Sequence, residues 1–125
     1  MFCHQFYILQ YLSEKYLWGI EDDIKLLHKS GIPGDFLIYP KMDDKDGYPV
    51  RIAFMLVNKM EKRVVQKIKV LKKGKWVSFD TRFLKSSEPE WYDTVAEMID
   101  NVPDEFSWCL QRPFLEFHQR FNENT

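Results

Sequence analysis

The chain has 125 residues, of which 45% are hydrophobic, 30% are charged and 16% are aromatic, and its formal net charge is -1 at pH 7. This is enough apolar material for the core of one domain, and the near-neutral charge gives no overall attraction to nucleic acid or to an anionic membrane surface. No apolar run reaches the roughly 20 residues that a membrane-spanning helix needs. The start of the sequence lacks the positive charge of a signal peptide, so we expect a cytoplasmic protein in which Cys3 and Cys109 stay free thiols.

Residues 1–15 are predicted to be a helical extension. Apolar side chains recur there every three or four positions, at Phe2, Phe6, Leu9, Leu12 and Tyr16. This is the period of an amphipathic helix, and a loosely ordered leader is the alternative. Cys3 and His4 lack a second pair of ligands, so they do not indicate a metal site.

A short strand over residues 16–20 and a helix over residues 22–31 are predicted next. The helix begins at Asp22 and Asp23, because carboxylates suit the positive end of the helix dipole. Its inner stripe is formed by Ile24, Leu27 and His28, with Leu26 beside it. Gly31 ends it, since glycine is favoured just past a helix C-terminus.

The stretch 34–40 is predicted to be a buried strand around which the chain is organised. Residues 36–38 are an apolar run of strand length, residues 32–34 have turn composition, and Pro40 has no N–H to donate to a sheet. A polar loop over residues 41–49 follows and contains three aspartates, Asp43, Asp44 and Asp46. Their spacing does not fit an EF-hand loop, so we expect no bound metal and no cofactor.

The middle of the chain is predicted to form the rest of the sheet. Residues 50–57 are nearly all apolar, which is typical of a central strand that is covered on both faces. Residues 63–71 form the next strand, residues 72–75 a hairpin turn, and residues 76–79 a strand that pairs back.

A second helix and a closing strand are predicted in the last third. After a loop over residues 82–89, the helix covers residues 91–102 and ends before Pro103. Its apolar stripe is Tyr92, Val95, Met98, Ile99 and Val102, which fits the helical period. Residues 109–114 form the closing strand, and residues 115–125 are a polar tail that we expect to fray.

Five of these segments resemble, in the same order, the motifs of Src homology 2 (SH2) domains, in a form closest to Fer-type non-receptor tyrosine kinases. They are Tyr-Leu-Trp-Gly-Ile at 16–20, Gly-Asp-Phe-Leu-Ile at 34–38, Val-Gln-Lys-Ile-Lys-Val at 65–70, the helix with Thr94 and Glu97, and Leu-Gln-Arg-Pro at 110–113. The resemblance implies an α+β fold over residues 16–114, with a central antiparallel sheet and one helix on each face.

The resemblance also implies the site. In SH2 domains an arginine that follows Phe-Leu-Val grips the phosphate of phosphotyrosine, and here Tyr39 stands at that position. Losing its two charge-assisted bonds costs about 3–6 kcal/mol. Glu21 falls where the family has a helix arginine, and Lys67 and Lys69 share one strand face. The implied peptide- and phosphate-pocket positions are Tyr39, Lys67, Lys69, Glu21, Lys41 and Ile68.

The predicted function is therefore that of an atypical SH2-like module for protein interaction in tyrosine-kinase-type signalling. Its partners would be tyrosine-containing or phosphotyrosine-containing segments of signalling proteins, and ordinary phosphotyrosine binding would be weakened or lost. The alternative is phosphotyrosine binding through Lys67 and Lys69. We expect a monomeric adaptor rather than an enzyme, because the sequence has no kinase, nucleophile-elbow or phosphate-loop motif.

Two further hypotheses come from other classes. Nucleic-acid binding would use a basic strip, formed by Lys59, Lys62, Arg63, Lys67, Lys69, Lys72, Lys73 and Lys75, with Trp76 and Tyr48 to stack bases. Lysines on an exposed strand also prevent edge aggregation, which is the simpler interpretation. The only formal catalytic pair is Cys109 with His118 or His28.

Overall fold

The computed structural model describes residues 16–41, 49–85 and 88–115. The predicted N-terminal helix with Cys3 and His4, the aspartates of the loop 42–48 and the predicted tail beyond residue 115 lie outside these ranges.

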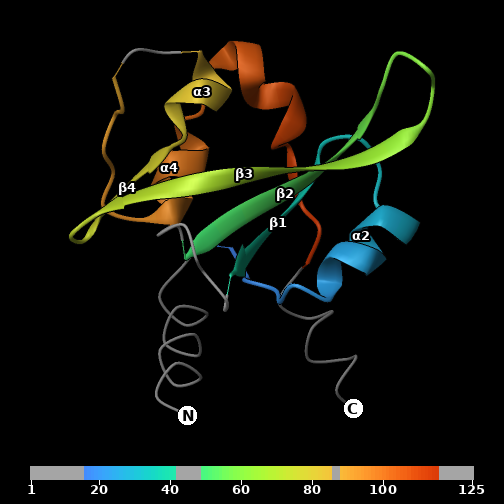
Figure 1. Cartoon of the computed structure of the whole chain (residues 1–125), viewed down its shortest axis with the longest axis horizontal. Helices are drawn as coiled ribbons and strands as arrows, with labels where there is room; N and C mark the ends of the chain where they lie inside the picture. Colours follow the sequence, from blue (N-terminus) through green and yellow to red (C-terminus); the bar gives the residue numbers. More distant parts are fainter. Residues whose placement is uncertain (1–15, 42–48, 86–87, 116–125) are drawn as a thin grey trace.

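The described residues form an α+β fold in which a sheet separates two helical layers (Figure 1). The strand order is β4-β3-β2-β1-β5. The strands are β1 (Asp35–Pro40), β2 (Val50–Val57), β3 (Arg63–Lys73), β4 (Trp76–Phe79) and β5 (Arg112–Pro113). The helices are α2 (Asp23–Ser30), α3 (Thr81–Leu84), α4 (Val95–Asp100) and the 3-10 helix η1 (Asp104–Cys109). Helix α2 lies on one face of the sheet, and α3 and α4 lie on the other.

The sheet is mixed, and in this respect the predicted antiparallel sheet is wrong. Strands β1 to β4 pair antiparallel in sequence, whereas β5 lies parallel to β1. The amides of Gln111 and Arg112 both donate to the carbonyl of Gly34 (2.9 and 3.0 Å), and the amide of Phe114 donates to Phe36 (2.8 Å). The chain thus returns from the α4 layer to the open side of β1 and runs in the same direction.

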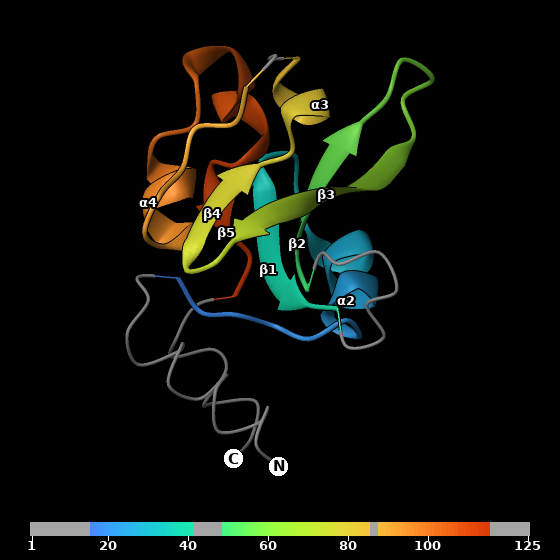
Figure 2. The same ribbon diagram turned by 60° about the vertical axis from the view of Figure 1, so that its left-hand side comes forward.

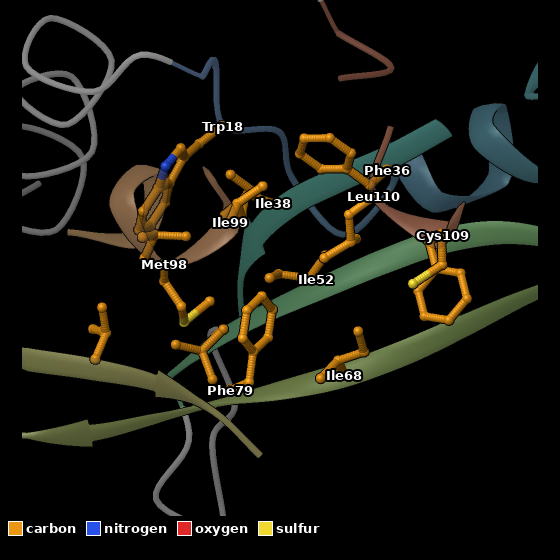
Figure 3. Close-up of a cluster of buried hydrophobic side chains, with 14 residues drawn as sticks. Trp18, Phe36, Ile38, Ile52, Ile68, Phe79, Met98, Ile99, Cys109 and Leu110 are labelled. Atoms are coloured by element: carbon orange, nitrogen blue, oxygen red, sulfur yellow. The ribbon is translucent and has the colours of Figure 1, made fainter. Parts of the chain in front are cut away.

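Strand β2 is central, as the sequence predicts, and its alternate side chains enter two separate cores. Ile52 and Phe54 belong to a large cluster on the α4 side, whereas Ala53 and Met55 belong to a smaller cluster under α2. Figure 3 shows the large cluster, in which side chains from β1, β2, β3, β4, α4 and η1 meet. Both faces of β2 are therefore covered, because consecutive strand residues point to opposite faces.

Helix α2 begins where the sequence predicts, after Asp22. Leu27 is its fully buried residue, and the amide of Gly31 donates to the carbonyl of Leu27 (2.8 Å) and ends the helix. His28, which was predicted on the inner stripe, is exposed instead. A position one residue beyond Leu27 is rotated about 100° around the helix, which is enough to bring it out of the interface.

Helix α4 is shorter than the predicted helix over residues 91–102. The backbone amide and carbonyl of Tyr92 are both bonded to Val77 (2.8 and 2.9 Å), so Tyr92 extends the sheet rather than a helix. The Thr94 hydroxyl then accepts a hydrogen bond from the amide of Glu97 (3.0 Å). This N-cap sets the start of the helix at Val95.

Three other predicted boundaries are corrected. Residues 81–84 form the short helix α3 at the predicted start of a loop, because the Asp80 carboxylate caps the amide of Arg82 (3.0 Å). The predicted closing strand is reduced to Arg112–Pro113, and Cys109 ends η1. The hairpin turn is narrower than residues 72–75, since Lys73 pairs with Trp76 and leaves two residues between them.

Residues 16–20, predicted to be a strand, are not part of the sheet. The amide of Gly19 donates a hydrogen bond to the carbonyl of Ile38 (2.7 Å), and no residue of this segment is assigned to a strand. A single bond does not make a ladder, so the segment crosses the end of β1 without joining it. Among the described helices, none is long and apolar enough to cross a lipid bilayer.

Candidate functional site

Tyr39, which the SH2 resemblance predicts to stand in place of the phosphate-gripping arginine, is a core residue. Its side chain is 1% exposed and lies in the cluster under α2 with Leu27 and Met55. Burial raises the pKa of the Tyr39 hydroxyl above its usual value of 10.0, and the nearby Arg51 partly opposes this shift. The hydroxyl is therefore neutral at physiological pH, and almost none of the side chain is presented to a ligand.

Arg51 on β2 is the residue that the sequence analysis missed. The register places Tyr39 opposite Arg51 on β1 and β2, and Arg51 opposite Lys69 on β2 and β3. Paired residues of neighbouring strands share a face, so these three side chains form one row on the α2 side. Arg51 is 7% exposed, which makes it the buried charged residue of this row. The row therefore places a guanidinium beside Tyr39.

Glu21 and Lys41 lie at the same end of the sheet and are bonded to one another. The Lys41 Nζ atom is 2.7 Å from a carboxylate oxygen of Glu21, and both side chains are partly exposed. Both groups also act on the pKa of Tyr39, which Glu21 raises and Lys41 lowers. Because Glu21 is paired, it is not a free carboxylate aimed at the place of a phosphate.

The remaining predicted positions lie on β3 and on both of its faces. Lys67 and Lys69 are on the α2 side, opposite Ala53 and Arg51. Ile68 is 3% exposed and belongs to the large cluster on the other side. The structure thus brings Glu21, Lys41 and Arg51 close to Tyr39 and places Lys69 in register with Arg51. Lys67 lies two residues further along β3 on the same face, and Ile68 is separated from these residues by the thickness of the sheet.

A surface hollow of about 390 Å³ lies along β3. Its lining consists of Gln66, Lys67, Ile68, Lys69, Asp80, Arg82 and Phe83. The wall that faces β3 is therefore formed by the N-cap residue of α3 and by α3 itself. Arg82 and Asp80 form an ion pair across 3.3 Å, and the Arg82 side chain is 78% exposed. Lys67, Lys69 and Arg82 supply cations to the lining, and Ile68 and Phe83 supply apolar surface. The volume of the hollow is within the usual range of ligand pockets.

The sequence pattern indicates only some of the residues that line this face and the hollow. Arg51 interrupts an otherwise apolar strand that was itself predicted to be covered on both faces, so its burial was implied by that prediction. Asp80, Arg82 and Phe83 have no such signal, because they reach β3 only through the path of the chain after β4.

The basic strip proposed for nucleic acid is partly engaged within the protein. The Arg63 guanidinium donates to the carbonyls of His28 and Gly31, at 2.7 Å each, and so holds the end of α2. Lys75 lies over the ring of Trp76, 5.2 Å from its centroid. A ring face that carries a lysine is less available for stacking with a base. Tyr48 lies outside the described residues.

Cys109 has the environment of a structural thiol. It is fully buried, it donates to the carbonyl of Phe106 (3.0 Å), and burial raises its pKa to about 11. His28 is exposed on α2, on the opposite side of the sheet, so these two residues do not form the formal pair. His118 lies outside the described residues, and within the described ranges no three acidic, histidine or cysteine residues are grouped to hold a metal ion.

Comparison of the chain with models of known protein families gives no match, and comparison with curated proteins gives none either. The resemblance to SH2 domains therefore remains a prediction from the sequence motifs.

Proposed function

We propose that the chain is an SH2-like peptide-recognition module of tyrosine-kinase-type signalling in which ordinary phosphotyrosine binding is weakened or lost. The observation that carries this proposal is the burial of Tyr39, which is 1% exposed in the core under α2. A phosphate grip needs a charged fork at the surface, and residue 39 supplies neither charge nor access.

The hollow along β3 is the feature that supports peptide binding. It adjoins Lys67 and Lys69, and the part of it formed by Phe83 supplies an aromatic surface. Aromatic and cationic groups together are typical of sites that bind peptide side chains. Its volume of about 390 Å³ suits a few side chains rather than a folded domain.

The test is fluorescence polarisation at about 150 mM salt with two degenerate peptide libraries, one with a central tyrosine and one with a central phosphotyrosine. We expect binding that does not depend on phosphorylation of the tyrosine, and at least a tenfold loss in Lys67→Glu, because a carboxylate then stands in the hollow. Lys59→Glu is the matched control, since Lys59 is exposed on the β2–β3 turn and does not line the hollow. If the wild-type protein binds no peptide of either library, the proposed function is wrong.

A second candidate function is phosphotyrosine binding through replaced bases, and Arg51 favours it. An arginine that is 7% exposed lies in register with Lys69, so a guanidinium and an ammonium adjoin on one face. An arginine fork makes paired charge-assisted bonds to a phosphate, and a lysine adds a point charge.

The phosphorylated library separates the two candidates. If the second candidate is right, the wild-type protein prefers the phosphorylated peptides at least tenfold, and Arg51→Lys loses most of this preference although the charge is kept. Tyr39→Arg is expected to raise affinity for phosphopeptides where the rest of the site is intact. A folded Tyr39→Arg protein without any gain would show that residue 39 does not line a phosphate site.

A further inference from the structure

Strand β3 is longer than the strand on its outer side. Strand β4 pairs with β3 only from Val70 to Lys73, as Figure 2 shows at one end of β3. Residues 63–68 pair with β2 on one side, and no strand among the described residues lies on the other. Residues 63–68 of β3 therefore form a free sheet edge, although β3 is not the outermost strand of the sheet. This free edge begins where the pairing with β4 stops.

The hydrogen-bond pattern shows which backbone groups face this edge. The amide and carbonyl of Val77 on β4 bind Tyr92, on the side of β4 away from β3 (2.9 and 2.8 Å). The backbone amide and carbonyl of the next residue, Ser78, therefore point towards β3. The residue opposite Ser78 is Leu71, which therefore points its backbone groups outwards from β2. Because backbone groups alternate along a strand, Val65 and Lys67 also direct their amides and carbonyls outwards.

The hollow lies along this same part of β3. Four consecutive residues of β3 line it, and the opposite wall comes from Asp80, Arg82 and Phe83, which follow β4 in the chain. The hollow thus lies between these residues of β3 and the segment that follows β4, next to the outward backbone groups of Lys67. Exposed strand edges bind extended peptides by adding a strand to the sheet.

The two sides of the edge differ in chemistry. Lys67 and Lys69 lie on the α2 side, whereas Ile68 and Phe83 belong to the side of the large cluster. The side chains of a strand added here would also point to the two faces of the sheet in turn, so one set would meet the lysines and the other the apolar side. Acidic side chains complement the lysines, and apolar side chains complement the part of the hollow formed by Phe83.

We infer that the free edge of β3 beyond β4 binds an extended segment of a partner protein, with alternating acidic and apolar residues, by strand addition. This rests on the proposed function as a peptide-recognition module and states its binding mode and ligand class. The affinity comes from backbone hydrogen bonds to Lys67 and the neighbouring outward residues, and the selectivity comes from charge on one face.

The decisive variants are Lys67→Pro and Lys67→Ala. Both remove the lysine side chain, but only proline also removes the outward amide. Proline is tolerated at an edge position whose amide faces away from the sheet, and circular dichroism and thermal unfolding check that the variant is folded. The probe is a degenerate library of seven-residue peptides, with Asp or Glu at odd positions and Val, Ile or Thr at even positions. We expect a loss of a few fold in Lys67→Ala and at least a further tenfold loss in Lys67→Pro.

Backbone methylation of the probe gives an independent readout that needs no protein variant. Two sets of the library carry N-methyl groups at either the odd or the even positions. Strand addition predicts that one set loses binding and the other keeps it, because only alternate amides face β3. Equal binding by both sets, together with equal affinities of Lys67→Pro and Lys67→Ala, overturns strand addition and leaves the proposed function intact.

RNA or a second copy of the chain at the free edge of β3 would give different results. Tighter binding of random-sequence RNA than of the acidic library, with a steep dependence on salt, overturns the choice of a peptide. A wild-type dimer in sedimentation equilibrium that dissociates in Lys67→Pro overturns it in favour of a second copy of the chain. If neither the acidic library nor the tyrosine library binds, the proposed function fails together with the inference.

Discussion

The two faces of the sheet differ in the kind of side chain that fills them. The face under α3 and α4 is a continuous apolar cluster with several aromatic rings, in which Phe54 packs near Phe83 and Trp108 (ring centroids 6.2 and 5.9 Å apart). The face under α2 has a smaller, mostly aliphatic cluster that ends in a polar row, where Tyr39 and Arg51 are both buried.

This difference predicts unequal contributions of the two faces to stability. Burial of apolar surface stabilises the fold, whereas a buried guanidinium has a desolvation cost that apolar packing does not have. The aromatic face is therefore expected to be the main source of stability, and the α2 face and the adjoining edge of β3 carry the cationic side chains of the proposed binding site. Variants on each face should accordingly affect different measurements.

The largest effect is expected for Phe54→Ala on the aromatic face. The residue is 1% exposed at the centre of the cluster, so removing its ring leaves a cavity and lowers the free energy of unfolding by about 3–5 kcal/mol. Urea denaturation measures this change. Val57→Ala on the same strand is the control, because Val57 is 48% exposed and its truncation should cost less than about 0.5 kcal/mol. Similar losses in both variants would contradict the assigned core.

The next effect depends on pH and concerns Cys109 on the same face. Burial raises the pKa of its thiol from 9.0 to about 11, so the folded protein keeps a proton that the unfolded chain releases. The stabilisation that the buried, protonated thiol gives to the folded state is complete below pH 9 and is lost as the pH rises through 11. The total loss in the free energy of unfolding is about 3 kcal/mol. The stability of the wild type relative to Cys109→Ala should therefore fall between pH 8 and pH 11 in a reducing buffer. A difference that stays constant over this range would show that the thiol is not buried.

A smaller effect compares how the helices of the two faces begin. Thr94 caps α4 through a 3.0 Å hydrogen bond from the amide of Glu97, whereas Asp22 at the start of α2 makes no side-chain cap bond. Thr94→Ala should lower the free energy of unfolding by about 1 kcal/mol. Asp22→Ala should cost less, since only its charge near the helix dipole is lost. Thermal unfolding of both variants measures the difference, and the reverse order would contradict the assigned caps.

The smallest change in stability is expected on the α2 face, for Arg51→Met. Methionine keeps the apolar volume of the arginine stem and removes the desolvation cost of the charge, so the free energy of unfolding should change by less than about 1 kcal/mol. Urea denaturation checks this, and a loss as large as that of Phe54→Ala would make Arg51 a structural residue.

The site was only partly predictable, because its residues meet through pairings that no local pattern specifies. Tyr39 and Lys69 stand out by comparison with the SH2 motifs, but their common neighbour Arg51 is defined by the strand register. The free edge of β3 was equally hidden, because it depends on where β4 stops. The sequence indicated both strands but not that β4 pairs with β3 only at residues 70–73.

The sequence by itself determined the elements that depend on local periodicity: the helix after Asp22, the buried strand before Pro40 and the central strand of residues 50–57. Apolar period and end-stop residues are local, so they can be read along the chain. Only the tertiary structure decided the parallel placement of β5 and the short α4, because both depend on backbone bonds to distant residues. The Tyr92 pairing with Val77 is such a case: it removes the first turn from a helix that the apolar stripe favours.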